Sequence, residues 1–474
     1  MKIRLIEPAP THINMFSYTY LPRLGLPMIG AALKTADHDV VIYCPELRPI
    51  DWADVLAADL VGLSSTTSTA PAAYEMADKL RRSGVPTVIG GSHVTFMADE
   101  ALEHADYVAR GEGGDALMLD LIDALEGRRA LATIPGLSFR RDGAAIHNQQ
   151  RKRCPDLDAL PVPDVSLIAG SEKLRLTPIM TSWGCPFACN FCSVTAMFGR
   201  AYRYRSAEHV MAELEEKRPQ RIFFYDDNFA ADRRRLKTLL RMMIAGGRVV
   251  PWTAQARADV VKDPELLDLM RRSGCERLAI GIESVNQATL DGFEKSQSVE
   301  DVARAIDTLH EYGIASHGMF VLGADTDSVE TIRDTARFAR GHEIDTLMLN
   351  ILTPAPGTRL FAELDEAGRI FDRHWDLYDA QHVVFTPAQM TADELQREVL
   401  RAYSRFYSAG QGLKYVAALR FGPLALHGWH WWFLRRWARE SGNRAYLKML
   451  GRAPLGGRPA MQLTADHTAV RSRG

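Results

Sequence analysis

The amino-acid sequence predicts an α/β protein in three parts: a doubly wound N-terminal domain, a partial (β/α)6 barrel and a helical C-terminal extension. Short apolar runs alternate with helical patterns over the first 150 residues, and a second alternating series begins near residue 176. Such alternation is typical of parallel sheets covered by helices. The 474 residues exceed one ordinary core, so several domains are expected. We assign residues 1–150 to the first domain, 151–172 to a linker, 173–372 to the barrel and 373–474 to the helical extension with a disordered tail.

The first domain alternates strands and helices from its first residues. Strands are expected over residues 2–8, 39–45, 58–65, 86–93 and 106–114, and helices over 24–37, 70–84, 98–105 and 114–127. Domains of this kind bind ligands at the carboxyl ends of their parallel strands. Residues 148–170 contain three prolines and no sustained period, which favours an extended interdomain linker.

The second series predicts the barrel. Strands are expected over residues 176–184, 221–229, 249–257, 275–284, 315–325 and 346–358. About six strand-and-helix units indicate a partial, TIM-like barrel whose site lies at its C-terminal mouth. The helix expected over 206–217 has Ser206 as its N-cap. In the extension, residues 391–408 follow an amphipathic helical pattern and residues 464–474 resemble a disordered tail.

Composition excludes several classes of protein. Hydrophobic residues make up 46% and charged residues 24% of the chain, and the formal net charge is -2. That balance provides no global field for nucleic acid or an anionic membrane. Six cysteines are too sparse for a disulfide scaffold. No N-terminal signal and no run of roughly 18 apolar residues is visible, so a cytoplasmic protein is expected.

Three cysteines lie within the nine residues "GCPFACNFC". Cys185, Cys189 and Cys192 have the spacing CxxxCxxC, and no fourth ligand follows at zinc-knuckle spacing. Thiolates bind zinc or iron–sulfur clusters. Three thiolates leave one iron of a 4Fe–4S cluster without a protein ligand, as a chelating substrate requires, and Phe191 is placed to cover an adenine ring. A structural zinc site is the alternative.

This spacing, with an aromatic residue before the last cysteine and after the first barrel strand, resembles the radical S-adenosylmethionine (SAM) superfamily. The resemblance implies that the open iron binds the amino and carboxylate groups of SAM. Electron transfer then cleaves SAM to methionine and a 5'-deoxyadenosyl radical, with a donor such as flavodoxin or ferredoxin.

Further barrel strand ends resemble the SAM-binding motifs of that superfamily. Carboxylates or a guanidinium there suit the amino, carboxylate and ribose groups of SAM, and a glycine permits close approach to the adenine. Helix capping and surface ion pairing are the alternatives. The expected SAM-binding residues are Phe191, Asp226, Asp227, Arg257, Glu283, Ser284 and Gly323.

The first domain resembles the Rossmann-like cobalamin-binding domains fused to radical SAM barrels. "VGLSSTTST", "IGGSHVT" and "ARGEGG" carry the resemblance, which implies cobalamin contacts at Ser64, Ser65, Thr66, Gly90, Gly91, His93, Thr95, Gly111 and Glu112. His12 lies in the loop that carries a cobalt ligand in the methionine-synthase type, although the Asp and Gly of DxHxxG are missing. His93 is equally suited to cap the next helix. Two alternatives for this domain are disfavoured. A methylthiotransferase domain would bring three more cysteines than residues 1–150 contain. A plain nucleotide-binding domain would have a GxGxxG motif after the first strand, and none is present.

The C-terminal segment "GWHWWFLRRWARE" combines Trp429, Trp431, Trp432 and Trp437 with Arg435, Arg436 and Arg439. Aromatic and basic residues together favour interfaces between apolar and wet regions. Peripheral membrane contact, a roof over an apolar substrate, and a helix packed on the barrel are the alternatives. Nucleic-acid binding is not expected because the surrounding charge is balanced.

The resemblance implies a cobalamin-dependent radical SAM enzyme with a 4Fe–4S cluster, SAM and cobalamin. Methylation of an unactivated carbon or phosphorus in a small-molecule or lipid-like substrate is the leading prediction. An oxidative cyclase resembling the anaerobic magnesium-protoporphyrin ester cyclase is the alternative, and a non-catalytic cobalamin or SAM sensor is a remote one. No residue is predicted to be catalytic.

Overall fold

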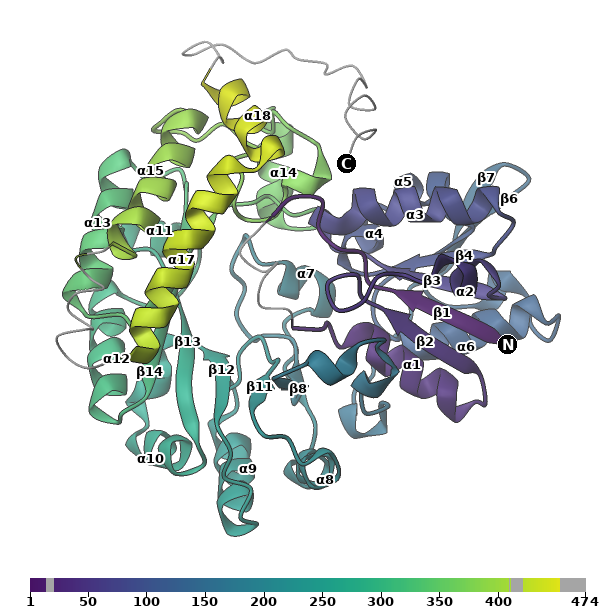
Figure 1. The fold of residues 1–474 in the computed structure, drawn as a ribbon, viewed down its shortest axis with the longest axis horizontal. Helices are drawn as coiled ribbons and strands as arrows, with labels where there is room; N and C mark the ends of the chain where they lie inside the picture. The colour runs from purple at the N-terminus through teal and green to yellow at the C-terminus, as the bar shows by residue number, and fades with distance from the viewer. Residues whose placement is uncertain (14–20, 409, 411–420, 452–474) are drawn as a thin grey trace.

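The computed structural model describes residues 1–13, 21–408, 410 and 421–451, and they form two sheets covered by helices (Figure 1). The N-terminal sheet has the order β2-β1-β3-β4-β5-β6-β7. Its first five strands are parallel, and the β6–β7 hairpin continues it antiparallel. The strands are β1 (Lys2–Ile6), β2 (Asp39–Tyr43), β3 (Leu60–Ser64), β4 (Thr87–Gly90), β5 (Tyr107–Ala109), β6 (Leu137–Arg141) and β7 (Ala144–His147).

Helices cover both faces of this sheet, as the predicted doubly wound fold requires. One apolar cluster joins the sheet to α1 (Gly25–Thr35) and α6 (Gly114–Leu125). A second joins the opposite face to α2 (Trp52–Leu56), α3 (Ala70–Arg82), α4 (Ser92–Phe96) and α5 (Ala98–His104). The order 2-1-3-4-5 places the topological switch between β1 and β3, where such domains bind ligands.

The predicted linker packs against the first domain instead of crossing open space. Its regular structure is three short turns, η4 (Leu157–Ala159), η5 (Val165–Leu167) and η6 (Ser171–Lys173). Asp164 N donates to Pro27 O at 3.1 Å, and Ala169 N donates to Ile42 O at 2.8 Å. The linker therefore continues along α1 and β2 before the barrel begins.

The second sheet is the predicted partial barrel of six parallel strands, in the order β15-β14-β13-β12-β11-β8. Its strands are β8 (Thr177–Ile179), β11 (Ile222–Phe224), β12 (Trp252–Ala256), β13 (Cys275–Glu283), β14 (Ala315–Leu322) and β15 (Thr346–Ile351). A small hairpin of β9 (Ser182–Trp183) and β10 (Arg203–Tyr204) stands beside it.

Helices alternate with the barrel strands. They are α7 (Ser193–Phe198), α8 (Ala207–Lys217), α9 (Arg233–Ala245), α10 (Pro264–Arg272), α11 (Gln287–Gly292), α12 (Val299–Glu311), α13 (Val329–Gly341) and α14 (Arg359–Glu366), with η2 (Thr67–Thr69) and η7 (Ala258–Lys262) as short turns in the first domain and barrel respectively. Ser206 caps α8 as predicted, since its hydroxyl accepts from His209 N at 3.1 Å.

The C-terminal helices close the edge of the barrel at β15. After η8 (Trp375–Leu377) come α15 (Ala392–Phe406), α17 (Phe421–Arg439) and α18 (Ser441–Leu450). The hydroxyls of Tyr403 and Tyr407 accept from Leu349 N at 2.7 Å and Leu347 N at 2.9 Å. These bonds satisfy amides that an edge strand would leave open. The predicted tail at 464–474 lies outside the described residues.

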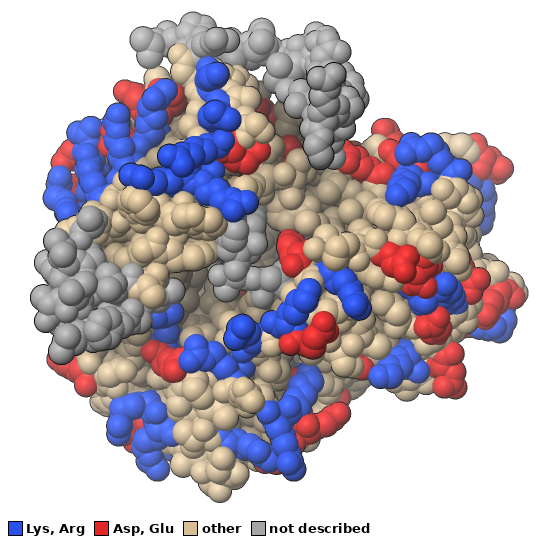
Figure 2. Space-filling model, viewed as in Figure 1, with Lys and Arg blue, Asp and Glu red and all other residues tan. Residues whose placement is uncertain are grey.

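Residues that follow the carboxyl ends of the two parallel sheets contact each other, and Figure 2 shows a hollow between the two lobes. Leu24 and Met28 of the first domain pack with Met180 after β8. A Cβ on Gly357, after β15, would lie 2.4 Å from the ring of Phe96 in α4. Both predicted ligand-binding edges therefore meet at one interface. No helix in the described part of the chain is long and apolar enough to span a membrane.

Candidate cofactor site

The cysteine loop follows β9 and ends at α7. Gly184 has a φ of 82°, and a Cβ there would lie 2.6 Å from Ala201 O, so the entry to the loop requires glycine. Cys192 is the N-cap residue of α7, and its N–H donates to Cys189 O at 3.2 Å. Cys185 is the first cysteine, and all three have free thiols that are partly buried.

The thiols lie in a mixed electrostatic environment. Burial raises the pKa of the Cys192 thiol to about 11, and neighbouring Cys189 and Asp227 act in the same direction. Burial also raises the pKa of Cys189, while Lys295 and Arg257 oppose the shift. An apoprotein with these groups holds thiols, and a bound cation favours their thiolate form.

The donor set fits a cluster better than a single ion. Among the described residues, no three histidine, cysteine, aspartate or glutamate side chains gather closely enough to hold one metal ion. Structural zinc requires four ligands that converge on one point. A 4Fe–4S cluster instead spreads its thiolates over separate irons. Three free thiols in one loop therefore fit the cluster better than a single zinc ion.

Arg257 braces the cysteine loop. Its guanidinium lies 3.6 Å from the ring centroid of Phe187, inside the loop. Its Nη2 donates to Lys295 O and, at 3.4 Å, to Ser296 O. The sequence predicted a partner for the SAM carboxylate at Arg257. The structure places its guanidinium between two loops, with backbone carbonyls and an aromatic ring as partners.

Glu283 forms a buried ion pair with Lys295, a residue that the sequence analysis missed. Lys295 Nζ lies 2.5 Å from Glu283 Oε1, and the two side chains are 8% and 10% exposed. A Cβ on Gly281 would lie within 2.8 Å of both charged groups. Lys295 acts on Cys189 electrostatically, so this pair lies close to the cysteine loop. In the sequence, Lys295 has no feature that separates it from a surface lysine.

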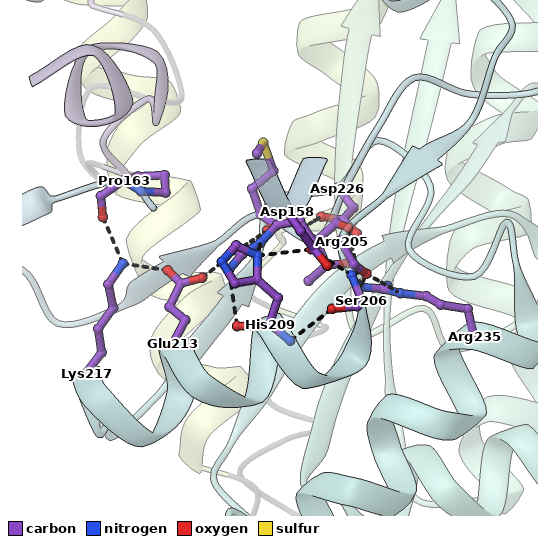
Figure 3. Close-up of polar contacts among 11 residues, drawn as sticks. Asp158, Pro163, Arg205, Ser206, His209, Glu213, Lys217, Asp226 and Arg235 are labelled. Atoms are coloured by element: carbon purple, nitrogen blue, oxygen red, sulfur yellow. Dashed lines mark hydrogen bonds and ion pairs between the residues drawn. The ribbon is translucent and has the colours of Figure 1, made fainter. Parts of the chain in front are cut away.

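The two aspartates after β11 have different environments. Asp226 is fully buried and accepts from Thr181 N at 2.7 Å, from the Thr181 hydroxyl and from the Ser182 hydroxyl at 2.8 Å. Figure 3 shows Asp226 beside Arg235 in this network. Asp226 therefore supports the backbone that leads into the cysteine loop, and the N-cap of the helix that follows, α9, is Asp232 instead.

Asp227 instead lies near the cysteines. Its side chain is accessible to solvent, yet the surrounding protein and Asp226 raise the pKa of its carboxyl to about 6. The Gly184 backbone donates to it and opposes this shift. A carboxyl with this pKa beside Cys192 is a candidate partner for a cationic group of a ligand.

The other residues predicted to bind SAM contact different parts of the protein. The Phe191 ring meets Phe293 edge-on, with centroids 4.7 Å apart. Ser284 is buried, and its hydroxyl accepts from Asn286 N at 3.0 Å. A Cβ on Gly323, whose φ is 107°, would lie 2.6 Å from Leu395 of α15. The close approach at Gly323 is therefore to a C-terminal helix.

In the first domain, the ends of β3 and β4 are tightly joined. Gly91 has a φ of 118°, and a Cβ there would lie 2.1 Å from Ser65 O. Ser65 N donates to Gly90 O at 2.8 Å. Ser64 ends β3, and Thr66 starts η2 with a capping box. These residues form a compact turn at the expected cobalamin-binding edge.

His93 and Thr95 follow that turn in α4. His93 is fully buried, its Nε2 lies 3.4 Å from Glu100, and its Nδ1 has no hydrogen-bond partner among the described residues. It does not cap the next helix, α5, whose N-cap is Met97. The Thr95 hydroxyl donates to Gly91 O at 2.8 Å and accepts from Gly111 N at 3.0 Å. An unpartnered buried nitrogen and a glycine turn fit a polar ligand at this edge.

Glu112 and His12 are engaged elsewhere. The Glu112 carboxylate pairs with Arg203 of the barrel hairpin. His12 Nε2 lies 3.0 Å from Asp376, and its Nδ1 lies 4.0 Å from Glu440 at the start of α18. Asp376 and, less strongly, Glu440 raise the pKa of His12 against the effect of burial. His12 thus contacts the C-terminal extension through both ring nitrogens.

Comparisons with known proteins match both halves of this site. Residues 179–339 match the radical SAM superfamily model, and residues 16–119 match the B12 binding domain model. The chain is 31% identical over 414 residues to the anaerobic magnesium-protoporphyrin IX monomethyl ester cyclase of Cereibacter sphaeroides, covering 81% of this chain and 67% of the relative. The chain belongs to the cobalamin-binding radical SAM enzyme family. Its cofactors are SAM, a 4Fe–4S cluster and cobalamin.

Other members of this radical SAM family show how far the likeness extends. The bacteriochlorophyllide d C-12(1)-methyltransferase of Chlorobaculum tepidum is 28% identical over 458 residues, which cover 94% of each chain. The structure of the radical SAM methyltransferase TsrM from Kitasatospora setae, with cobalamin and a [4Fe-4S] cluster bound, superposes with a TM-score of 0.65. At 20% identity, over 77% of this chain and 78% of that one, it shows the shared fold.

Proposed function

We propose that this enzyme methylates an unactivated carbon or phosphorus atom of a small-molecule or lipid-like substrate, with SAM as the methyl source. The observation that carries the proposal is a loop with three free thiols between β9 and α7, in a chain whose residues 16–119 match the B12 binding domain. We assign Cys185, Cys189 and Cys192 to the cluster. When bound, the cofactors supply the electron and methyl transfer that side chains cannot perform.

In this proposal the barrel residues orient SAM. Lys295, beside Cys189, suits a carboxylate, and Asp227, beside Cys192, suits an ammonium group. Glu283 holds Lys295 in place, and Phe191 contributes an apolar wall. We assign Arg257 to support of the cysteine loop, on the strength of its contacts with Phe187 and the carbonyl of Lys295.

In the first domain we propose that Ser64, Gly90, Gly91 and His93 line the cobalamin site. The left-handed Gly91 and the unpartnered Nδ1 of His93 support this assignment. Ser65, Thr66, Thr95 and Gly111 shape the turns around that site through their bonds to one another and to the backbone. Glu112 and His12 are assigned to contacts between parts of the chain.

A cyclase or another radical oxidation is the second candidate, because the relative at 31% identity is a magnesium-protoporphyrin ester cyclase. Methylation is preferred because the relative that covers 94% of both chains is a methyltransferase. Both relatives are named for tetrapyrroles, which supports a large apolar substrate here. A flavodoxin or ferredoxin is the proposed electron donor, and a cytoplasmic location remains a prediction.

Peripheral membrane contact through α17 is a further part of this proposal. Phe433 and Trp437 are buried in the barrel core, whereas Trp431 and Trp432 are 46% and 43% exposed. The Arg435 guanidinium lies 3.9 Å from the Trp431 ring, and Figure 2 shows Lys and Arg gathered where α15 and α17 lie. Exposed Trp and Arg suit a headgroup layer.

Mass spectrometry distinguishes the two chemistries. Holoenzyme, reductant and SAM with a deuterated methyl group are incubated with a tetrapyrrole or a polyprenoid. A product heavier by about 14 mass units with ordinary SAM, and carrying deuterium from the labelled SAM, is the expected result, since the cofactors allow methyl transfer. A product lighter by about two mass units without deuterium would favour oxidation and contradict the methyltransferase proposal.

A further inference from the structure

Glu112 and Arg203 form a buried ion pair between the two halves of the molecule. Arg203 Nη1 and Nη2 each lie 2.7 Å from one carboxylate oxygen of Glu112. The side chain of Arg203 is only 9% exposed and that of Glu112 only 4%. Two parallel hydrogen bonds between planar groups set the relative orientation of the groups as well as their distance.

Arg203 belongs to the structure that frames the cysteine loop. In the β9–β10 hairpin it pairs with Trp183, and its guanidinium lies 5.7 Å from the Trp183 ring. Trp183 directly precedes Gly184 at the start of the loop. Its ring stacks at 5.8 Å on Phe198 in α7, the helix that follows Cys192. The two flanks of the loop are therefore packed together beside Arg203.

Glu112 is connected to the glycine turn of the first domain. The N–H of the preceding residue, Gly111, donates to the Thr95 hydroxyl at 3.0 Å. That hydroxyl donates to Gly91 O at 2.8 Å. Two hydrogen bonds thus link the loop of Glu112 to the turn at the end of β4.

The linker joins the same contact. Arg203 Nη1 also donates to Cys154 O at 2.8 Å, and Arg153 Nε lies 3.5 Å from Glu112. Arg153 lies so close to Gly199, the residue after α7, that a Cβ there would overlap its guanidinium. Three separate segments therefore meet at this buried pair.

We propose that the Glu112–Arg203 pair positions the cysteine loop against the Gly90–Gly91 turn and so sets the distance and orientation between the two cofactors. The inference rests on the proposed function, because it takes the loop as the cluster site and the turn as part of the cobalamin site. A buried ion pair adds little net stability compared with an apolar contact, whereas a bidentate one defines geometry. Glu112 and Arg203 are positioning residues.

Dipolar electron paramagnetic resonance between the reduced cluster and cob(II)alamin tests this role in the holoenzyme. Arg203→Met and Glu112→Gln should shift or broaden the distance distribution, with iron and cobalamin contents that match the wild type. Arg203→Lys keeps the charge without the bidentate geometry and should give an intermediate distribution. The distance distribution of the double variant should be no more shifted or broadened than that of the more affected single variant, since both substitutions remove the same interaction.

Hydrogen exchange of the apoprotein provides a readout that needs no cofactor. Residues 181–205 should exchange about tenfold faster in Arg203→Met, as expected when hydrogen bonds to a charged group are lost. Arg333→Met is the matched control, because Arg333 pairs bidentately with Glu398 at 3.2 Å within the barrel and its helical cover. It should change neither readout.

The inference would be overturned if Arg203→Met and Glu112→Gln both showed the dipolar coupling and the hydrogen exchange of the wild type. An equal change in Arg333→Met would also overturn it, since a general loss of stability would then explain the effect. Failure of the wild type to bind a cluster or cobalamin would instead contradict the proposed function, and the apoprotein exchange would still decide the role of the pair.

Discussion

The backbone around the buried ion pair beside the cysteine loop is strained. Glu283 and Lys295 are the charged partners, and Glu283 has a φ of 63°. Glu294 and Ser296, on either side of Lys295, have φ values of 54° and 53°. Non-glycine residues with a left-handed backbone persist only where the surrounding structure holds them in place, and they cluster at ligand sites. Strand-end patterning identified Glu283, but the loop conformation that brings Lys295 to it leaves no pattern in the sequence.

Removal of the lysine tests the importance of this pair. Lys295→Met leaves a buried carboxylate unpaired and should lower the free energy of unfolding by about 3–5 kcal/mol. Glu283→Gln in the same chain should recover part of that loss. Lys262→Met is the control, because Lys262 and Asp301 form an exposed pair at 3.3 Å of the kind that contributes about 1 kcal/mol or less. Equal losses in denaturant titrations of Lys295→Met and Lys262→Met would contradict the account.

His12 makes a pH-dependent contact with the C-terminal extension. Its folded pKa is raised above 6.5, chiefly by the hydrogen bond to Asp376. A raised pKa means that the stabilisation is complete below the unfolded pKa and disappears as the pH rises through the folded pKa. The melting temperature of His12→Gln should therefore fall furthest below the wild type in acid, and the difference should shrink in alkali. A difference that grows with pH would contradict the assignment.

At the scale of elements, periodicity predicted the parallel strands of both sheets and most of the long helices, and turn chemistry was the signal that was overlooked. The β6–β7 hairpin was not predicted, although Asp142 and Gly143 form its turn with φ values of 51° and 81°. Asp-Gly between short apolar runs favours a two-residue hairpin turn. Strands that add to a sheet edge after its last helix do not follow the strand–helix alternation on which the prediction relied.

The turn after β4 allows a test of local geometry. Gly91→Ala places a Cβ 2.1 Å from Ser65 O, a clash with backbone that no rotamer relieves. Gly127→Ala also has a positive φ, 79°, with nothing within 4 Å, and should lose about 1–2 kcal/mol from conformation alone. We expect Gly91→Ala to lose clearly more stability in thermal unfolding and to take up less cobalamin. Equal losses in both variants would show that the contact with Ser65 is unimportant.

At the scale of the whole molecule, the sequence predicted at which sheet edges the site would lie but not how those edges meet. Cys185, Cys189 and Cys192 were recognisable because their spacing is local. Glu112 and Arg203 lie 91 positions apart, and each resembles a surface charge until the domains are docked. Asp226 and Gly323 follow family patterns, yet their contacts are with Thr181 and Leu395. Local spacing was predictable, whereas interdomain packing required the structure.

Anaerobic reconstitution with iron and sulfide, followed by reduction in the presence of SAM, tests the central claim most directly. The measured product is 5'-deoxyadenosine, and the spectrum of the reduced cluster should change when SAM is added. Cys185→Ala, Cys189→Ala and Cys192→Ala should each abolish SAM cleavage, while Cys275→Ala, at a buried cysteine in β13, should retain it. Wild-type amounts of 5'-deoxyadenosine from Cys185→Ala would contradict the assignment of the cluster to this loop.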